Sequence, residues 1–147
     1  MFKNILIPTD GSALSRQAIA LGVKLAKSLG ARVTGVFAAP PATPLVYRDH
    51  LPVGYGTPEQ NARMIRDNAA RYLGVIARAA KKAGVRYEGI QATSDFPADV
   101  ILEVARKKKC DLIVMASRGR RGLKGVLLGS ETQKVLIQSK IPVLVCR

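Results

Sequence analysis

The chain has little of what metal sites and hydrolase triads need. It contains one histidine, His50, and two cysteines, Cys110 and Cys146, which lie far apart in the sequence. A single histidine rules out a cluster of histidine ligands, and its position in a proline-rich segment argues against a Ser-His-Asp triad. Two isolated cysteines indicate neither a zinc ribbon nor a disulfide framework. We expect both cysteines to be buried thiols.

Aromatic and acidic residues are also scarce. Tryptophan is absent and there are only three Phe and four Tyr, so the sequence shows no row of rings for base stacking. Lys and Arg number 24 against 10 Asp and Glu, a net charge of +14 that predicts attraction to polyanions. The basic residues are spread over several expected helices. Nucleic acid is therefore not the expected partner, although polyanion binding through these helices stays open as an alternative.

Long apolar runs are missing as well. The first residues, MFKNILIPTD, contain only a short apolar stretch that ends at Pro8, which predicts neither a secretory signal nor a membrane anchor. Hydrophobic residues make up 48% of the 147 residues, which is typical of a globular domain with a sizeable core. We expect one cytoplasmic domain over residues 1–147, without membrane contact.

Short apolar stretches alternate with amphipathic helical patterns along the whole chain. Strands are expected at residues 3–8, 32–38, 85–93, 112–115 and 141–147. Helices are expected to start at Ser12, at Thr57 with a Gln60 capping box, at residues 95–97 and at Ser130. Gly30 and Gly84 are expected to end the first two helices. The alternation predicts an α/β fold with three α/β/α layers around a five-stranded parallel sheet, and it leaves the strand order open.

The segment 39–56 contains four prolines and two glycines without a clear period. Loops of this length in compact domains are often functional or mobile. The same composition fits a surface excursion without a ligand. The sequence does not decide between these two interpretations.

Residues 111–140 combine an apolar strand, a basic glycine-rich loop over 116–128 and a helix that opens at Gly129 and Ser130. We expect Ser130 to cap this helix in a capping box with Gln133. Free N–H groups of the first helical turn attract anions, and glycines let the main chain approach a ligand closely. The stretch predicts a phosphate site, with a plain tight connection as the alternative.

Asp10 follows the first expected strand, at the carboxyl edge of the sheet where open α/β proteins usually bind ligands. Capping of the first helix is its alternative role. If the first and fourth strands are neighbours, Asp10 and the glycine-rich loop meet across one crevice.

Four segments, taken in order, resemble the universal stress protein family of the adenine-nucleotide-binding kind: ILIPTDGS, DFPADVILEVA, DLIVMASRGRRGLKGVLLGSETQKVL and IPVLVCR. The resemblance covers essentially the whole chain. The family's phosphate motif is Gly, two residues, Gly, nine residues, Gly and then Ser or Thr. Gly119, Gly129 and Ser130 match its last three positions, and Ala116 stands at the first. If that position needs a positive φ, alanine would cost roughly 1–2 kcal/mol there.

The resemblance implies a Rossmann-like, adenine nucleotide alpha hydrolase-like fold with strand order 3-2-1-4-5. It implies binding of ATP or AMP, possible Mg²⁺ on the phosphates near Asp10, and a homodimer through residues 142–146. Where family members have a glycine before the third helix, this chain has Ser94 and Asp95. The residues implied to surround the nucleotide are Pro8, Thr9, Asp10, Ala38, Met115, Ser117, Arg118, Gly119, Gly129, Ser130 and Thr132.

The expected function is that of a nucleotide-dependent regulator in a stress response, not an enzyme. The sequence lacks a Gly-x-x-x-x-Gly-Lys-Ser/Thr motif, so any ATP hydrolysis is expected to be slow. Ala116 keeps a second interpretation open, that of a dimeric interaction module that binds no nucleotide. The sequence does not separate ATP from AMP.

Overall fold

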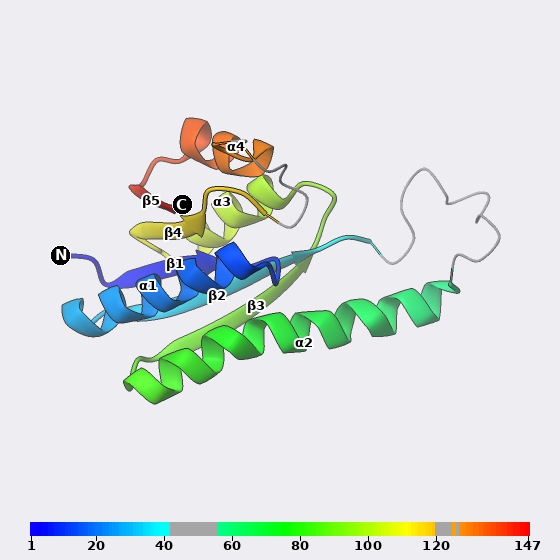
Figure 1. The fold of residues 1–147 in the computed structure, drawn as a ribbon, viewed down its shortest axis with the longest axis horizontal. Helices are drawn as coiled ribbons and strands as arrows, with labels where there is room; N and C mark the ends of the chain where they lie inside the picture. Colours follow the sequence, from blue (N-terminus) through cyan, green and yellow to red (C-terminus); the bar gives the residue numbers. More distant parts are fainter. Residues whose placement is uncertain (42–55, 120–124, 126) are drawn as a thin grey trace.

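The computed structural model describes residues 1–41, 56–119, 125 and 127–147. Within these residues the chain forms a five-stranded sheet with the order β3-β2-β1-β4-β5, and every strand pairing is parallel (Figure 1). The predicted fold class and the implied strand order are confirmed. The strands are β1 (Asn4–Pro8), β2 (Arg32–Ala39), β3 (Tyr87–Thr93), β4 (Leu112–Ala116) and β5 (Val143–Cys146).

Two helices cover each face of this sheet. The helices are α1 (Ala13–Leu29), α2 (Pro58–Ala83), α3 (Pro97–Lys107) and α4 (Ser130–Gln138). Ile5 and Ile7 of the central strand pack with α1 and α2, whereas Leu6 packs with α3 and α4. Side chains alternate between the two faces along a strand, so a strand buried on both faces must be apolar throughout.

Some strand ends lie one or two residues from the predicted bounds. Val85 stands outside β3 because its N–H closes the end of α2, donating to the Ala80 carbonyl at 2.9 Å. Lys3 stands outside β1, and its N–H donates to the Asp111 carboxylate at 2.8 Å. Near β5, the Ile141 N–H donates to the Ser139 hydroxyl at 3.2 Å rather than to a strand. In each case the N–H donates to a helix carbonyl or a side-chain oxygen and not to a neighbouring strand.

The predicted ends of α1 and α2 are confirmed. The Ser12 hydroxyl accepts a hydrogen bond from the Ser15 N–H at 3.1 Å. Thr57 and Gln60 form the reciprocal capping box, with distances of 3.1 and 3.0 Å. Gly30 and Gly84 end the helices in the left-handed conformation, which glycine adopts without steric cost.

Part of the expected glycine-rich and proline-rich segments lies outside the described residues. Of the loop predicted over residues 39–56, Ala39 belongs to β2, and residues 42–55 are not described. Residues 120–124 and 126 are likewise outside, and they include Gly122 and the basic residues Arg120, Arg121 and Lys124 of the predicted glycine-rich loop. No helix in the described part of the chain combines the length and apolar character of a membrane span.

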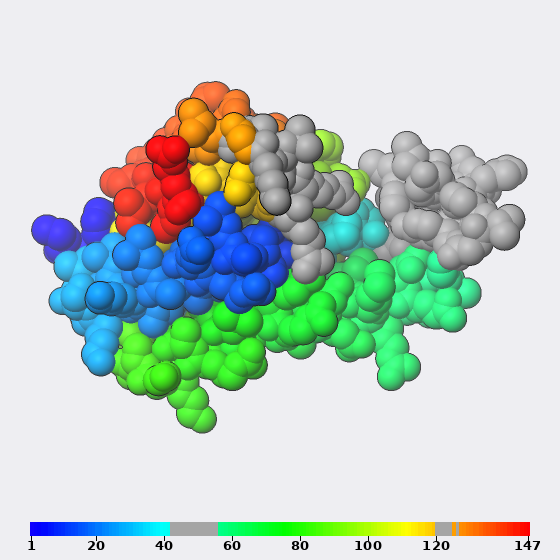
Figure 2. All heavy atoms as spheres, viewed as in Figure 1, coloured from blue at the N-terminus to red at the C-terminus, as the bar shows by residue number. Residues whose placement is uncertain are grey.

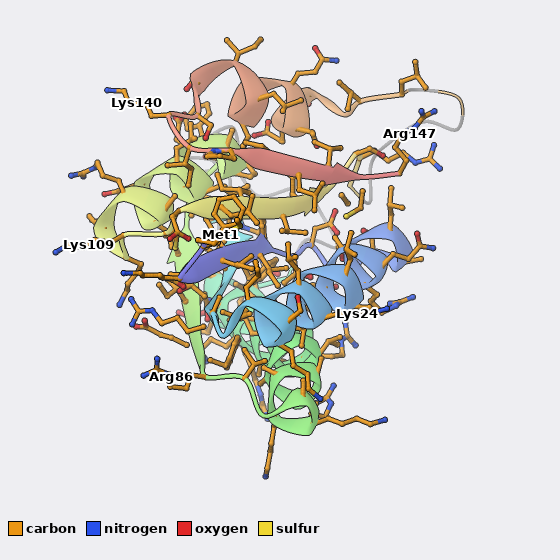
Figure 3. The ribbon with its side chains drawn as sticks, turned by 90° about the vertical axis from the view of Figure 1, so that its left-hand side faces the viewer. Met1, Lys24, Arg86, Lys109, Lys140 and Arg147 are labelled. Atoms are coloured by element: carbon orange, nitrogen blue, oxygen red, sulfur yellow. The ribbon has the colours of Figure 1, made fainter. Side chains whose placement is uncertain are left out.

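Basic side chains point outward at several separate places, on α1 and on segments that connect helices and strands. Lys24, Arg86, Lys109 and Lys140 lie apart from one another in Figure 3. The three ion pairs found among the described residues are all partly or largely exposed, and such pairs contribute little stability. They are Lys107 with Glu103, Lys108 with Glu88, and Lys134 with Glu131.

The two cysteines are free, and they differ in burial. Cys110 is buried as predicted, whereas Cys146, on the edge strand β5, is only half-buried. Burial raises the pKa of the Cys110 thiol, and the same cause raises the pKa of Cys146. Both groups are therefore neutral thiols at neutral pH.

Candidate functional site

Asp10 and the segment after β4 meet at the carboxyl edge of the sheet. β1 pairs with β4, with Ile5 opposite Leu112, so the residues that follow the two strands leave the sheet side by side. A Cβ atom built on Gly119 would overlap with the Asp10 carboxylate oxygen Oδ2. The meeting predicted for neighbouring first and fourth strands is observed, and position 119 has no room for a side chain while Asp10 keeps this position.

The start of α4 differs from the prediction. Gly129 is the N-cap, with φ −70° and ψ 157°, and its N–H donates to the Ser117 carbonyl at 2.7 Å. Ser130 is therefore already the first helical residue and cannot cap the helix. Gln133 Nε2 donates to the Leu128 carbonyl at 3.2 Å instead of reaching back to a capping residue. The predicted capping box at Ser130 is wrong because the chain enters the helix one residue earlier.

With Gly129 as its N-cap, α4 has no side-chain cap. The first N–H groups of a helix have no partner within it, and together with the helix dipole they favour a negative charge. Thr132 lies in the same turn and is buried, and its hydroxyl donates to the Ala116 carbonyl at 3.0 Å. This bond fixes the first turn of α4 to the end of β4, beside Asp10.

Glu131 also lies in this first turn, where its charge would repel an anion. Its carboxylate is engaged elsewhere: Oε2 accepts from the Ala98 N–H at 2.8 Å, and Oε1 accepts from Lys134 Nζ at 3.1 Å. The N-cap of α3 is Phe96, which provides no side-chain hydrogen bond. Glu131 thus caps α3 from another helix. The sequence prediction missed this role, for which a phenylalanine at the α3 cap was the available signal.

Asp10 does not cap α1, as its alternative interpretation expected, but it has a structural role in the turn before that helix. Its Oδ1 accepts from the Ser12 N–H at 3.0 Å and shapes the turn into α1, where Ser12 itself is the cap. Its Oδ2 faces Gly119. The turn contribution and a position at the crevice are therefore compatible in one carboxylate.

Ala116 carries no backbone strain. It lies in β4 opposite Cys146, and among the described residues Lys109 is the only non-glycine with a positive φ. The cost considered for a positive φ at position 116 therefore does not arise. The departure from the family's glycine changes the space beside the main chain, not its conformation.

The remaining implied residues divide between the two faces of the sheet. Ala38 and Met115 pack in the cluster that includes α3 and α4. The Thr9 hydroxyl instead lies 3.4 Å from the Ser15 hydroxyl and accepts from the Gly11 N–H at 3.2 Å, so it is engaged on the α1 side. A Cβ on Gly129 would lie 3.2 Å from the Arg118 Cα, so these two main-chain segments pass closely. The structure thus groups Asp10, residues 117–119 and residues 129–132 at one place, with Pro8 at the adjoining end of β1.

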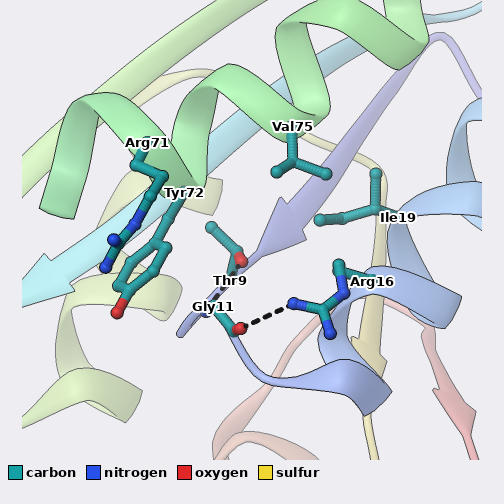
Figure 4. Close-up of a pocket in the computed structure, with 7 residues that line it drawn as sticks. All are labelled: Thr9, Gly11, Arg16, Ile19, Arg71, Tyr72 and Val75. Carbon is teal, nitrogen blue, oxygen red and sulfur yellow. Dashed lines mark hydrogen bonds between the residues drawn. The ribbon is translucent and has the colours of Figure 1, made fainter.

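The described residues contain no group of three or more His, Cys, Asp or Glu side chains that could hold a metal ion. They do contain a pocket of about 280 Å³, which lies between α1 and α2 and includes Thr9 and Gly11 in its lining (Figure 4). No residue of α4 lines this pocket.

The fold and the site define a doubly wound α/β domain in which an uncapped helix N-terminus lies beside a carboxylate at the carboxyl edge of the sheet. Comparison with known proteins assigns it further. The sequence profile described as "Universal stress protein family" matches residues 1–147. The chain belongs to the universal stress protein family.

Several relatives match over the full chain. Universal stress protein YxiE of Bacillus subtilis is 35% identical over 158 residues, with 100% of both chains covered. Universal stress protein MJ0531 of Methanocaldococcus jannaschii is 33% identical over 147 residues, covering 100% of this chain and 83% of the relative.

Solved structures show the same fold. Protein MJ0577 of M. jannaschii superimposes with a TM-score of 0.77 at 25% identity, over 99% of this chain and 96% of the other. A universal stress protein in complex with cAMP has a TM-score of 0.69 at 22% identity, over 99% and 97%. One from Archaeoglobus fulgidus in complex with dAMP has a TM-score of 0.66 at 14% identity, over 100% and 98%.

Proposed function

We propose that this chain binds an adenine nucleotide, ATP or AMP, with its phosphates at the first turn of α4. The single observation that carries the proposal is the meeting of the uncapped α4 N-terminus with Gly119 and the Asp10 carboxylate. Main-chain N–H groups at such a turn bind phosphate well. The complexes of two family members with cAMP and dAMP support the class of ligand.

The first turn of α4 would provide a suitable electrostatic environment for the phosphates. Glu131 is the acidic residue of the first turn, and its carboxylate is held toward α3 by the Ala98 N–H. The chain as a whole carries a net charge of +14. The helix dipole would therefore stabilise a phosphate group at Ser130, and the Glu131 carboxylate would not face and repel it.

The sugar and base would lie toward the end of β1 and the α3/α4 face. Ala38 and Met115 are apolar and face this side of the sheet, and Pro8 ends β1. The Asp10 carboxylate lies between this region and the phosphates, where it suits a ribose hydroxyl. Mg²⁺ commonly binds through one or two carboxylates together with substrate phosphates, and Asp10 would fit as that carboxylate.

We further propose that the protein acts as a homodimer joined through residues 142–146. β5 is an edge strand, and Leu144 on it is 39% exposed. Figure 2 shows β5, in red, at the surface beside α4, where Leu136 and Ile137 are also exposed. A bare apolar edge strand favours pairing with another chain. The nucleotide would then regulate partner binding in a cytoplasmic stress response, and any hydrolysis would be slow.

Titration with ATP, with and without Mg²⁺, tests the nucleotide proposal by calorimetry. Ser130→Asp adds a carboxylate at an exposed first-turn position where it stabilises a helix, so this variant remains folded. We expect its ATP affinity to fall about ten-fold or more, because the added charge faces the phosphates.

Gln60→Glu is the matched control. It adds the same charge to the first turn of α2, which lies away from α4 in Figure 1, and it preserves the capping box with Thr57. ATP affinity should stay within a factor of two, on the order of the effect of a remote exposed charge. If Ser130→Asp and Gln60→Glu bind ATP with equal affinity, the phosphates do not lie at α4. If the unmodified protein binds no ATP, the alternative of a dimeric interaction module without nucleotide is favoured.

Sedimentation velocity tests the dimer. Leu144→Asp places a charge on the exposed edge of β5, where it would be buried between two strands in the proposed interface. We expect dimers for the unmodified protein and monomers for this variant. A dimer that persists in Leu144→Asp would move the interface away from β5.

A further inference from the structure

The pocket between α1 and α2 lies on the opposite face of the sheet from Ala38 and Met115. Ile19, Val75 and the ring of Tyr72 provide its apolar lining, and they belong to the clusters on the α1/α2 side. The β1–α1 turn contributes Thr9 and Gly11 (Figure 4). The candidate phosphate site and this pocket therefore lie on two sides of the same turn.

Two arginines give the pocket its charge. Arg16 comes from α1, and its Nη1 donates to the Gly11 carbonyl at 3.2 Å. Arg71 comes from α2, where its Nη2 donates to Asn68 Oδ1 at 2.8 Å and its guanidinium carbon lies 5.2 Å from the centre of the Tyr72 ring. These contacts hold both side chains in place, and each guanidinium has five N–H donors, so donors remain for a ligand.

Neither arginine is neutralised by a carboxylate in the described part of the chain. The ion pairs there involve Lys107, Lys108 and Lys134. The acceptors of both arginines, a carbonyl and an amide oxygen, are neutral. Asp10, the acid of the adjoining turn, accepts from the Ser12 N–H and faces Gly119. No acidic side chain among the described residues lines the pocket.

We propose that this pocket binds a small organic anion, a carboxylate or a phosphate monoester on a compact apolar body. Guanidinium groups bind both anions with charge-assisted hydrogen bonds. The body lies against Ile19 and Val75, while the charged group is held by Arg16, Arg71 or both. The volume of about 280 Å³ is below the roughly 300–1,000 Å³ of common ligand pockets, which selects a ligand smaller than a nucleotide.

Ligand-observed NMR of the full chain with benzoate and with phenyl phosphate tests the proposal, and benzyl alcohol is the neutral control. We expect saturable binding of at least one anion and none of the alcohol. The stronger of the two anions distinguishes a carboxylate ligand from a phosphate ester. Absence of saturable binding of both anions would overturn the proposal.

Variants locate the binding. Arg16→Gln and Arg71→Gln each remove one charge from an exposed side chain, and we expect the combined variant to bind the preferred anion about ten-fold more weakly or worse. The pair Arg63→Gln and Arg66→Gln also removes two charges, from exposed positions of α2 that do not line the pocket, and it should leave binding unchanged. If the pocket variant and the control weaken anion binding equally, the anion is attracted by the overall charge of the protein and not by the pocket. That result would overturn the proposal.

Val75→Phe fills the pocket from its apolar side. Val75 is half-buried, so the larger ring can extend into the cavity, and circular dichroism verifies the fold of the variant. We expect loss of anion binding with unchanged ATP affinity. If saturating ATP displaces the anion from the unmodified protein, the two ligands share one site, and the proposal of a separate anion pocket is overturned. If ATP does not bind at all, the anion measurements still test the pocket.

Discussion

The two helical layers of this domain cap their helices in different ways. On one face, α1 and α2 are capped by their own residues, Ser12 and Thr57, and end at glycines. On the other face, neither α3 nor α4 has a side-chain cap of its own. Glu131 of α4 caps α3, and the first turn of α4 stays open. The layer without local caps is the one that carries the candidate phosphate site.

The comparison indicates that a capped helix N-terminus and an anion-binding one exclude each other. A capping side chain at the start of α4 would occupy the N–H groups that an anion needs. Four substitutions test how far the two layers differ, and they are ordered by the expected size of their effect on the free energy of unfolding.

Gly11→Ala should be the most destabilising change, and it acts on the α1/α2 layer. Gly11 has φ +79°, and a Cβ there would overlap with the Tyr72 ring. Left-handed strain and forced repacking each cost roughly 1–3 kcal/mol, so we expect a loss of about 3 kcal/mol in urea unfolding. A loss below about 1 kcal/mol would show that Tyr72 moves aside freely.

Glu131→Ala should destabilise the α3/α4 layer by about 2 kcal/mol. The substitution leaves the N–H of the buried residue Ala98 without its charged acceptor. Glu131→Gln retains an oxygen that can accept from Ala98 and should lose clearly less. Chemical denaturation measures both, and equal losses would mean that charge, not the cap, is the stabilising feature.

Thr57→Ala removes a local cap from α2. Its hydroxyl accepts a hydrogen bond from one N–H group, that of Gln60, at an exposed helix end. We expect a loss of about 1 kcal/mol. An effect larger than that of Glu131→Ala would reverse the comparison between self-capped and cross-capped helices.

Lys109→Gly should stabilise the protein by roughly 0.5–1 kcal/mol. Lys109 has φ 51° after the end of α3, in the conformation that Gly30 and Gly84 adopt after α1 and α2. Glycine removes the left-handed strain but adds freedom to the unfolded chain, so the net gain is smaller than the strain itself. Thermal unfolding measures the gain, with Lys107→Gly at the last residue of α3 as a control that should destabilise.

Much of this molecule could be predicted because its signals are local. The apolar stretch of β1, the Ser12 and Thr57 caps and the terminal glycines depend on neighbours within a few residues. The capping box at Ser130 failed for the same reason. Its sequence pattern is present, but the bond between the Gly129 N–H and the Ser117 carbonyl starts the helix one residue earlier. That bond joins residues that are adjacent in space and distant along the chain.

The sequence by itself determined the alternation of strands and helices, because hydrophobic period and capping chemistry act over short distances. It also determined that Asp10 and the glycine-rich loop stand at two strand ends. Only the tertiary structure decided that Asp10 meets Gly119, that Glu131 turns away from the candidate phosphate site to cap α3, and that Arg16 and Arg71 border one pocket. These relations depend on which strands pair and how helices pack, and such long-range packing leaves no short pattern in the chain.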